Sequence, residues 1–147
     1  MQINQVFKYQ FLDSGMYLQE VTRHSQNGLV VNLHAISNTR VNFWIKFLGD
    51  IRSIRTDYLY VRAQDFEKIE TIKGEEFVEE TMVAEWLDSS YLANNVRNIV
   101  SGQRYHHFIV WTGEDRYSEI ITNEMPMVYT IQPRLENYDT WQNWSQS

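Results

Sequence analysis

Two adjacent histidines, His106 and His107, are the residues whose types and position most suggest chemistry. They fall in an apolar run that is typical of a β-strand, so their side chains point to opposite faces of a sheet and cannot share one metal ion. Imidazole titrates near neutral pH, and a carboxylate beside it can orient it as a general base. A neighbouring carboxylate would therefore decide which histidine can act in catalysis.

Glu119, in the next predicted strand, is the carboxylate that hairpin geometry favours. With a turn centred on residues 113–114, His106 lies diagonal to Glu119, on the same face as Tyr117. This arrangement predicts a general-base dyad of His106 and Glu119; a satisfied polar pair beside the core is the alternative interpretation. A register shift of one residue would separate the two side chains. His107 is expected to pack rather than react.

Aromatic side chains make up 14% of the sequence, and several lie close to arginines. A sheet face of Trp, Tyr and Arg can stack a planar, nucleotide-like ligand and hold a phosphate. The same composition is typical of protein–protein hot spots, or of a core covered by arginine stems. The candidate ligand-binding residues are Trp44, Tyr58, Tyr60, Arg62, Trp111 and Arg116, of which the last two are expected to pair across the C-terminal hairpin.

The negative charge is concentrated in one segment. Between Asp65 and Asp88 there are nine acidic and two basic residues, whereas the other 11 bases and 10 acids nearly cancel. Such a segment can bind a basic partner, or it can be the solvated face of a helix. The candidate partner-binding residues are Glu75, Glu76, Glu79 and Glu80. Because the arginines are scattered and form no basic patch, direct nucleic-acid binding is not expected.

Several function classes lack their motifs. With no cysteine in 147 residues, disulfides, thiolate zinc sites and thiol nucleophiles are excluded. The glycine-rich phosphate loops and the H-E-x-x-H and G-x-S-x-G motifs are also missing, so we predict neither a cofactor nor a metal. No apolar run is long enough for a membrane span, and the N-terminus does not resemble a secretory signal. A cytoplasmic homodimer is expected, since two-fold dimers are the commonest assembly.

The hydropathy pattern predicts the elements that would position these residues. Strands are expected over residues 6–12, 16–23, 29–36, 41–48, 54–63, 105–112, 116–122 and 127–132, with a hairpin turn at Asn27-Gly28. Helices are expected over 75–87 and 91–101, the second capped near Asp88-Ser89-Ser90. Residues 66–72 fit either a helical turn or an edge strand.

These elements predict an α+β fold with a single domain over residues 1–134. Its centre would be a mostly antiparallel, curved sheet of about seven or eight strands, with the helical pair inserted before the C-terminal hairpin. Residues 135–147 form a polar tail with two tryptophans.

Three functions fit this sequence. We favour a non-enzymatic binding protein (an adaptor, inhibitor or subunit) that acts through the aromatic and arginine sheet face or the acidic segment. A protein that binds or sequesters a nucleotide-like small molecule comes second. A small hydrolase or isomerase that uses His106 and Glu119 comes third.

Overall fold

A computed structural model describes residues 2–8, 18–25, 28–35, 42–58, 63–74, 77, 81–95, 104–111 and 116–129. In these ranges the chain is mostly antiparallel sheet with two helices, an α+β fold. The strands are β1 (Ile3–Lys8), β2 (Leu18–Ser25), β3 (Gly28–Ala35), β4 (Asn42–Phe47), β5 (Ile51–Tyr58), β6 (Thr81–Trp86), β7 (His106–Trp111), β8 (Arg116–Thr122) and β9 (Met127–Tyr129). The helices are α1 (Ala63–Lys73) and α3 (Ser90–Asn95).

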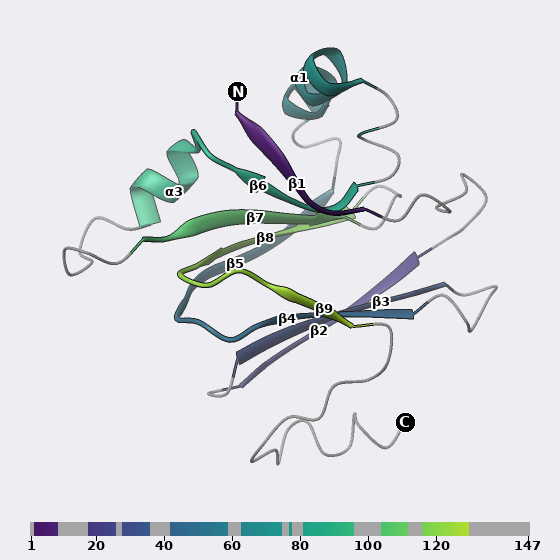
Figure 1. Cartoon of the computed structure of the whole chain (residues 1–147), viewed down its shortest axis with the longest axis vertical. Helices are drawn as coiled ribbons and strands as arrows, with labels where there is room; N and C mark the ends of the chain where they lie inside the picture. The colour runs from purple at the N-terminus through teal and green to yellow at the C-terminus, as the bar shows by residue number, and fades with distance from the viewer. Residues whose placement is uncertain are drawn as a thin grey trace.

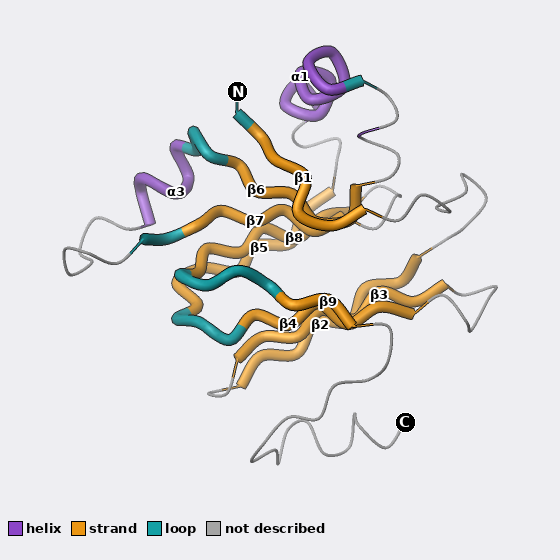
Figure 2. The backbone as a smooth tube through the Cα atoms, viewed as in Figure 1, coloured by secondary structure: helices purple, strands orange, loops and turns teal. Residues whose placement is uncertain are grey.

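The strands form two sheets rather than one. Sheet A has the order β1-β6-β7-β8-β5, and sheet B has the order β2-β3-β4-β9. Figure 1 shows sheet A lying above sheet B, with both helices on the far side of sheet A; Figure 2 separates the strands and helices by colour. The molecule therefore has three layers: helices, sheet A and sheet B.

The main core fills the space between the two sheets. Alternate residues of β4, namely Phe43, Ile45 and Phe47, are buried there, as the period of two along a strand requires. Sheet A faces them with Phe108 and Val110 of β7. The rings of Phe47 and Phe108 lie 5.6 Å apart between centroids and join the sheets directly.

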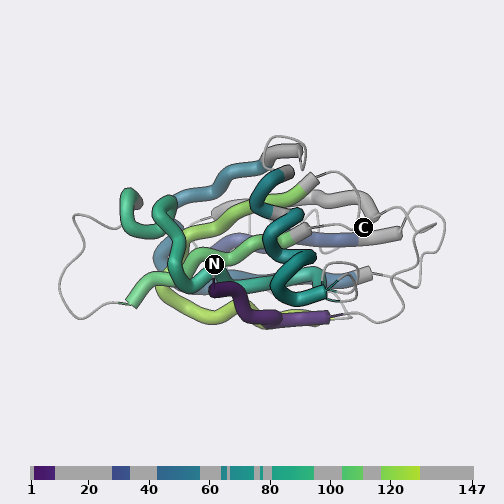
Figure 3. The backbone as a smooth tube through the Cα atoms, turned by 90° about the horizontal axis from the view of Figure 1, so that it is seen from above, coloured from purple at the N-terminus to yellow at the C-terminus, as the bar shows by residue number. Residues whose placement is uncertain are grey.

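A second, smaller core lies between sheet A and the helices. Ile109 of β7 and Tyr117 of β8 point to this side, opposite to Phe108, and pack in one cluster with Ile69 of α1. Figure 3 shows α1 lying across the strands of sheet A, with α3 at one end of the sheet. The outer face of sheet A is thus covered by helices, which leaves β7 buried on both faces.

Most of the expected strands are present within a few residues of their predicted bounds. The hairpin at Asn27-Gly28 is confirmed, because Ser25 pairs with Gly28 and leaves a two-residue loop. Gly28 has a φ of 129°, a conformation that favours glycine. The undecided segment 66–72 lies within helix α1.

The predicted helix over residues 75–87 is wrong where the structure describes it. Residues Thr81–Trp86 form β6, a strand between β1 and β7 whose first five residues are all buried. A strand buried on both faces has no alternating pattern, so the apolar spacing of Val78, Met82 and Trp86 resembles a helical period. The second predicted helix, 91–101, is present as α3 over Ser90–Asn95, and residues 96–101 lie outside the described ranges.

The predicted single curved sheet is also wrong. The chain changes sheets between β4 and β5, because β5 pairs with β8 in sheet A instead of returning along β4. β9 likewise leaves β8 and pairs with β4 in sheet B. Each crossing puts one apolar face of the strands into the shared core.

Within the residues that the structure describes, no helix is long and apolar enough to cross a membrane.

Candidate functional site

The register of the β7–β8 hairpin decides which histidine meets Glu119. Ile109 pairs with Glu119 and Trp111 with Tyr117, one residue away from the predicted register. Residues 112–116 therefore lie between the paired ends, one more than predicted. Because a shift of one residue moves side chains to the opposite face, the predicted dyad of His106 with Glu119 does not form, and His107 takes the place of His106.

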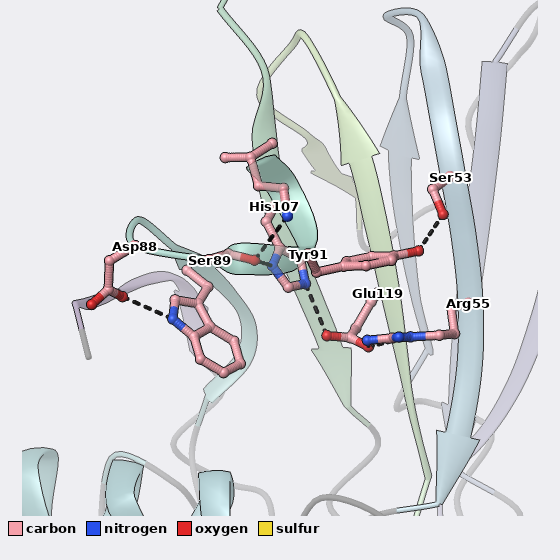
Figure 4. Close-up of polar contacts among 9 residues, drawn as sticks. Ser53, Arg55, Asp88, Ser89, Tyr91, His107 and Glu119 are labelled. Carbon is pink, nitrogen blue, oxygen red and sulfur yellow. Dashed lines mark hydrogen bonds and ion pairs between the residues drawn. The ribbon is translucent and has the colours of Figure 1, made fainter. Parts of the chain in front are cut away.

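A continuous chain of hydrogen bonds passes through His107. We call it the polar chain, and it consists of Ser89, His107, Glu119 and Arg55. His107 Nδ1 lies 2.6 Å from Ser89 Oγ, and its Nε2 lies 2.9 Å from Glu119 Oε1. Arg55 donates from Nε to Glu119 Oε2 at 2.8 Å, and its Nη2 donates to the same oxygen. Figure 4 shows the four side chains in line, linking α3 across β7 and β8 to β5.

The partners of each atom are compatible with one arrangement of the protons in which the imidazole of His107 is neutral. Ser89 is the N-cap of α3, since its Oγ accepts the Leu92 N–H at 3.0 Å, so the hydroxyl proton remains to be donated. We therefore assign this proton to the bond with His107 Nδ1, which acts as acceptor. The proton of the neutral imidazole then lies on Nε2 and is donated to Glu119.

The centre of the polar chain is dry, whereas its ends reach the surface. The side chains of His107 and Glu119 are 0% exposed, but that of Arg55 is 41% exposed and Ser89 is partly exposed. Trp86 stacks on His107 with ring centroids 5.6 Å apart, and Tyr91 meets the same ring edge-on at 5.2 Å. The buried imidazole is thus clamped between two aromatic rings.

Helix α3 is held over the polar chain at two further points. The Tyr91 hydroxyl is hydrogen-bonded to Ser53 of β5, and Arg55 Cζ lies 4.0 Å from the centroid of the Tyr91 ring, a cation–π contact. The second point is Asp88, which directly precedes the N-cap residue Ser89. Its Oδ1 accepts the indole N–H of Trp86 at 2.8 Å and the backbone N–H of Gln2 at 2.7 Å. The backbone bond from Gln2 holds the pKa of Asp88 below its ordinary value.

His106 forms a separate pair on the opposite face of sheet A. Its Nδ1 is hydrogen-bonded to Glu85 Oε2 of β6, and its ring stacks on Phe108 beside the inter-sheet core. Both side chains are slightly exposed, at 13% and 12%. Among the described residues no group of three or more His, Asp or Glu side chains is placed to hold a metal ion.

The other predicted site residues are not gathered on one surface. Trp44 lies in β4 of sheet B, while Tyr58, Trp111 and Arg116 lie in strands of sheet A. Arg116 pairs with Tyr58 and not with Trp111. Tyr117 is buried on the helix side of sheet A. Tyr60, Arg62, Glu75, Glu76, Glu79 and Glu80 lie outside the described residues, as does the tail, so their binding roles stay predictions.

Ser89 was predicted only as a helix cap, so its position beside His107 was missed. It stands 18 residues before His107, and only the pairing of β6 with β7 brings the two together. No family model, curated protein or solved structure matches this chain. Its function must therefore be argued from the site itself.

Proposed function

We propose that this protein is a hydrolase of carboxylic esters that uses Ser89 as its nucleophile. His107 is the general base, and Glu119 is the carboxylate that orients it. The observation that carries the proposal is the bond of 2.6 Å between Ser89 Oγ and His107 Nδ1, continued by the bond of 2.9 Å from Nε2 to Glu119. Nucleophile, base and orienting group are each within hydrogen-bonding reach of the next.

Each step of the reaction needs only one proton at His107 Nδ1. Ser89 Oγ bonds to the carbonyl carbon of the ester while its proton moves to Nδ1. The bond from the carbonyl carbon to the alkoxy oxygen of the ester then breaks, this oxygen takes the proton from Nδ1 and leaves as an alcohol, and the acyl group remains on Ser89. Water then adds to the acyl carbon and gives a proton to Nδ1. The bond from carbon to Oγ breaks, the proton returns to Oγ, and the carboxylic acid leaves.

Burial favours this chemistry at His107. The dry environment strengthens the interaction between the imidazolium that forms and the Glu119 carboxylate. Trp86 and Tyr91 keep the ring from turning, so Nδ1 stays directed at Ser89. Ser89 itself is partly exposed, and the buried Nδ1 lies 2.6 Å from its Oγ, so a substrate bound at Ser89 also lies next to the base.

The test is covalent labelling of the purified protein with a fluorophosphonate, a reagent that phosphonylates activated serines. Intact mass should show one adduct, and peptide mapping should place it on Ser89. The variant Ser89→Gly should show none; glycine also caps helices, so most of its cost in stability, about 1–3 kcal/mol, should come from the buried His107 Nδ1 that loses its partner. His107→Gln should label about 10²–10⁴-fold more slowly.

Ser90 provides the matched control, because it is the adjacent serine, lies in the first turn of α3 and is exposed. Ser90→Ala should label at the rate of the wild-type protein. Hydrolysis of p-nitrophenyl acetate should follow the same pattern across the variants. A wild-type protein that takes up no probe, or an adduct that persists in Ser89→Gly, would overturn the proposal.

A further inference from the structure

We infer that Arg55 is a positioning residue that sets the tautomer of His107 through Glu119. This inference rests on the proposed function only for its consequence, the reactivity of Ser89. Arg55 lies in β5 at the edge of sheet A within the described strands, two strands away from His107, and its Nε donates to Glu119. It acts through the one carboxylate that both residues share.

The two carboxylate oxygens of Glu119 bind different residues. Oε1 accepts from His107 Nε2, and Oε2 accepts two N–H groups of Arg55. A carboxylate that receives three N–H donors is held in its ionised form. An ionised Glu119 can only accept, so His107 must present Nε2–H to it, and in the neutral imidazole Nδ1 then carries no proton. Arg55 thereby prepares Nδ1 to receive the proton of Ser89.

Removal of the Arg55 guanidinium should shift a proton onto Nδ1 of His107. Glu119 is 0% exposed, and a buried carboxylate without a full counter-charge favours uptake of a proton. If Glu119 takes the proton, its O–H donates to Nε2 and the ring proton moves to Nδ1. If His107 takes it instead, the imidazolium carries protons on both nitrogens. In both cases Nδ1 is protonated and cannot accept from Ser89.

The two aromatic rings packed against His107 cannot replace the charge of Arg55. They are those of Tyr91 of α3 and Trp86 of β6, and both are uncharged. Asp57 follows two residues after Arg55 in β5. His106 and Glu85 lie on the opposite face of sheet A, against the inter-sheet core.

The direct measurement is the ¹⁵N chemical shifts of the His107 ring, assigned by comparison with His107→Gln. In the wild-type protein at pH 7, Nδ1 should carry no proton and Nε2 should carry one. In Arg55→Met, Nδ1 should be protonated, and Arg55→Lys should restore much of the wild-type pattern because it keeps the charge. The control is Arg52→Met: Arg52 is in the same strand and 44% exposed, but it pairs with Asp50 and Tyr105.

The kinetic measurement is the fluorophosphonate labelling rate as a function of pH. In Arg55→Met the rate at pH 7 should fall about 10²–10⁴-fold and rise again at higher pH, whereas Arg52→Met should keep the wild-type profile. An unprotonated Nδ1 in Arg55→Met, or a protonated Nδ1 in the wild-type protein, would overturn the inference. Failure of the wild-type protein to label would overturn the hydrolase proposal alone, because the ring shifts are read without any reaction.

Discussion

Two His–Glu pairs lie back to back in β7 and its neighbours, yet their surroundings differ. His107 and Glu119 are fully buried and connect to Arg55, whereas His106 and Glu85 stand at the rim of the inter-sheet core. An unmade hydrogen bond costs most where water cannot replace the missing partner. The two glutamates therefore allow the contribution of the same side chain to the free energy of unfolding to be compared in two environments.

We expect Glu119→Gln to destabilise the protein by about 1–3 kcal/mol. An amide has only one oxygen, so its NH₂ group must face a donor, either His107 Nε2–H or Arg55. Glu85→Gln should cost less, about 0.5–1 kcal/mol, since water reaches the rim. Urea unfolding followed by tryptophan fluorescence gives both values, and an equal loss in the two variants would contradict the difference in burial.

Among the elements, the start of β1 is tied to the turn between β6 and α3 by Asp88. Its Oδ1 accepts the Gln2 backbone N–H and the Trp86 indole N–H, and the first of these lowers its pKa below the ordinary 3.8. A carboxylate with a lowered pKa in the folded state adds stability above the unfolded value, and this stability disappears as the pH falls through the folded value.

Asp88→Asn should therefore lower the unfolding free energy at pH 7, and the difference from the wild-type protein should shrink steadily below about pH 4. The effect should stay under about 1 kcal/mol because Asp88 is exposed and solvent screens its charge. Asp50→Asn is the control, an exposed aspartate that pairs with Arg52 instead. A difference that grows as the pH falls would show that the backbone bond does not favour the ionised carboxylate.

The elements also show how far the sequence predicts this molecule. Local signals succeeded: the alternation of Phe43, Ile45 and Phe47 gave a strand, and Asp88-Ser89-Ser90 gave a helix cap. Signals that depend on distant partners failed. β6 is buried by β1 and β7, which are far away in the chain, and its apolar residues fit two periods equally well.

The candidate site was predicted only in part for the same reason. The sequence pointed to the double histidine and to Glu119, but the choice between His106 and His107 depended on a single residue of hairpin register. Ser89 and Arg55 come from a turn and an edge strand, and nothing local marks them as neighbours of His107. Only the assembled sheet gives the polar chain its order.

For the whole molecule, the layered arrangement implies two cores that contribute unequally to the stability of the fold. The inter-sheet core contains residues from both sheets, so neither sheet can keep its apolar face buried alone. The helix layer depends on fewer contacts: in the described part of α1, Ile69 is 1% exposed, while Ile72 and its polar neighbours face solvent. Loss of the helix layer should therefore leave the two sheets folded.

We expect Phe108→Ala to cost about 3–5 kcal/mol and to destabilise both sheets together. Ile69→Ala should cost about 2–5 kcal/mol at most. It should act mainly on α1, because the truncated side chain is the one that packs this helix against sheet A. Hydrogen exchange separates the two effects: Ile69→Ala should raise exchange in α1 while β3, β4 and β7 stay protected, and Phe108→Ala should raise it in both sheets. If Ile69→Ala exposed the sheets as fully as Phe108→Ala does, the two cores would form a single cooperative unit, and α1 would be as essential to the fold as the inter-sheet core.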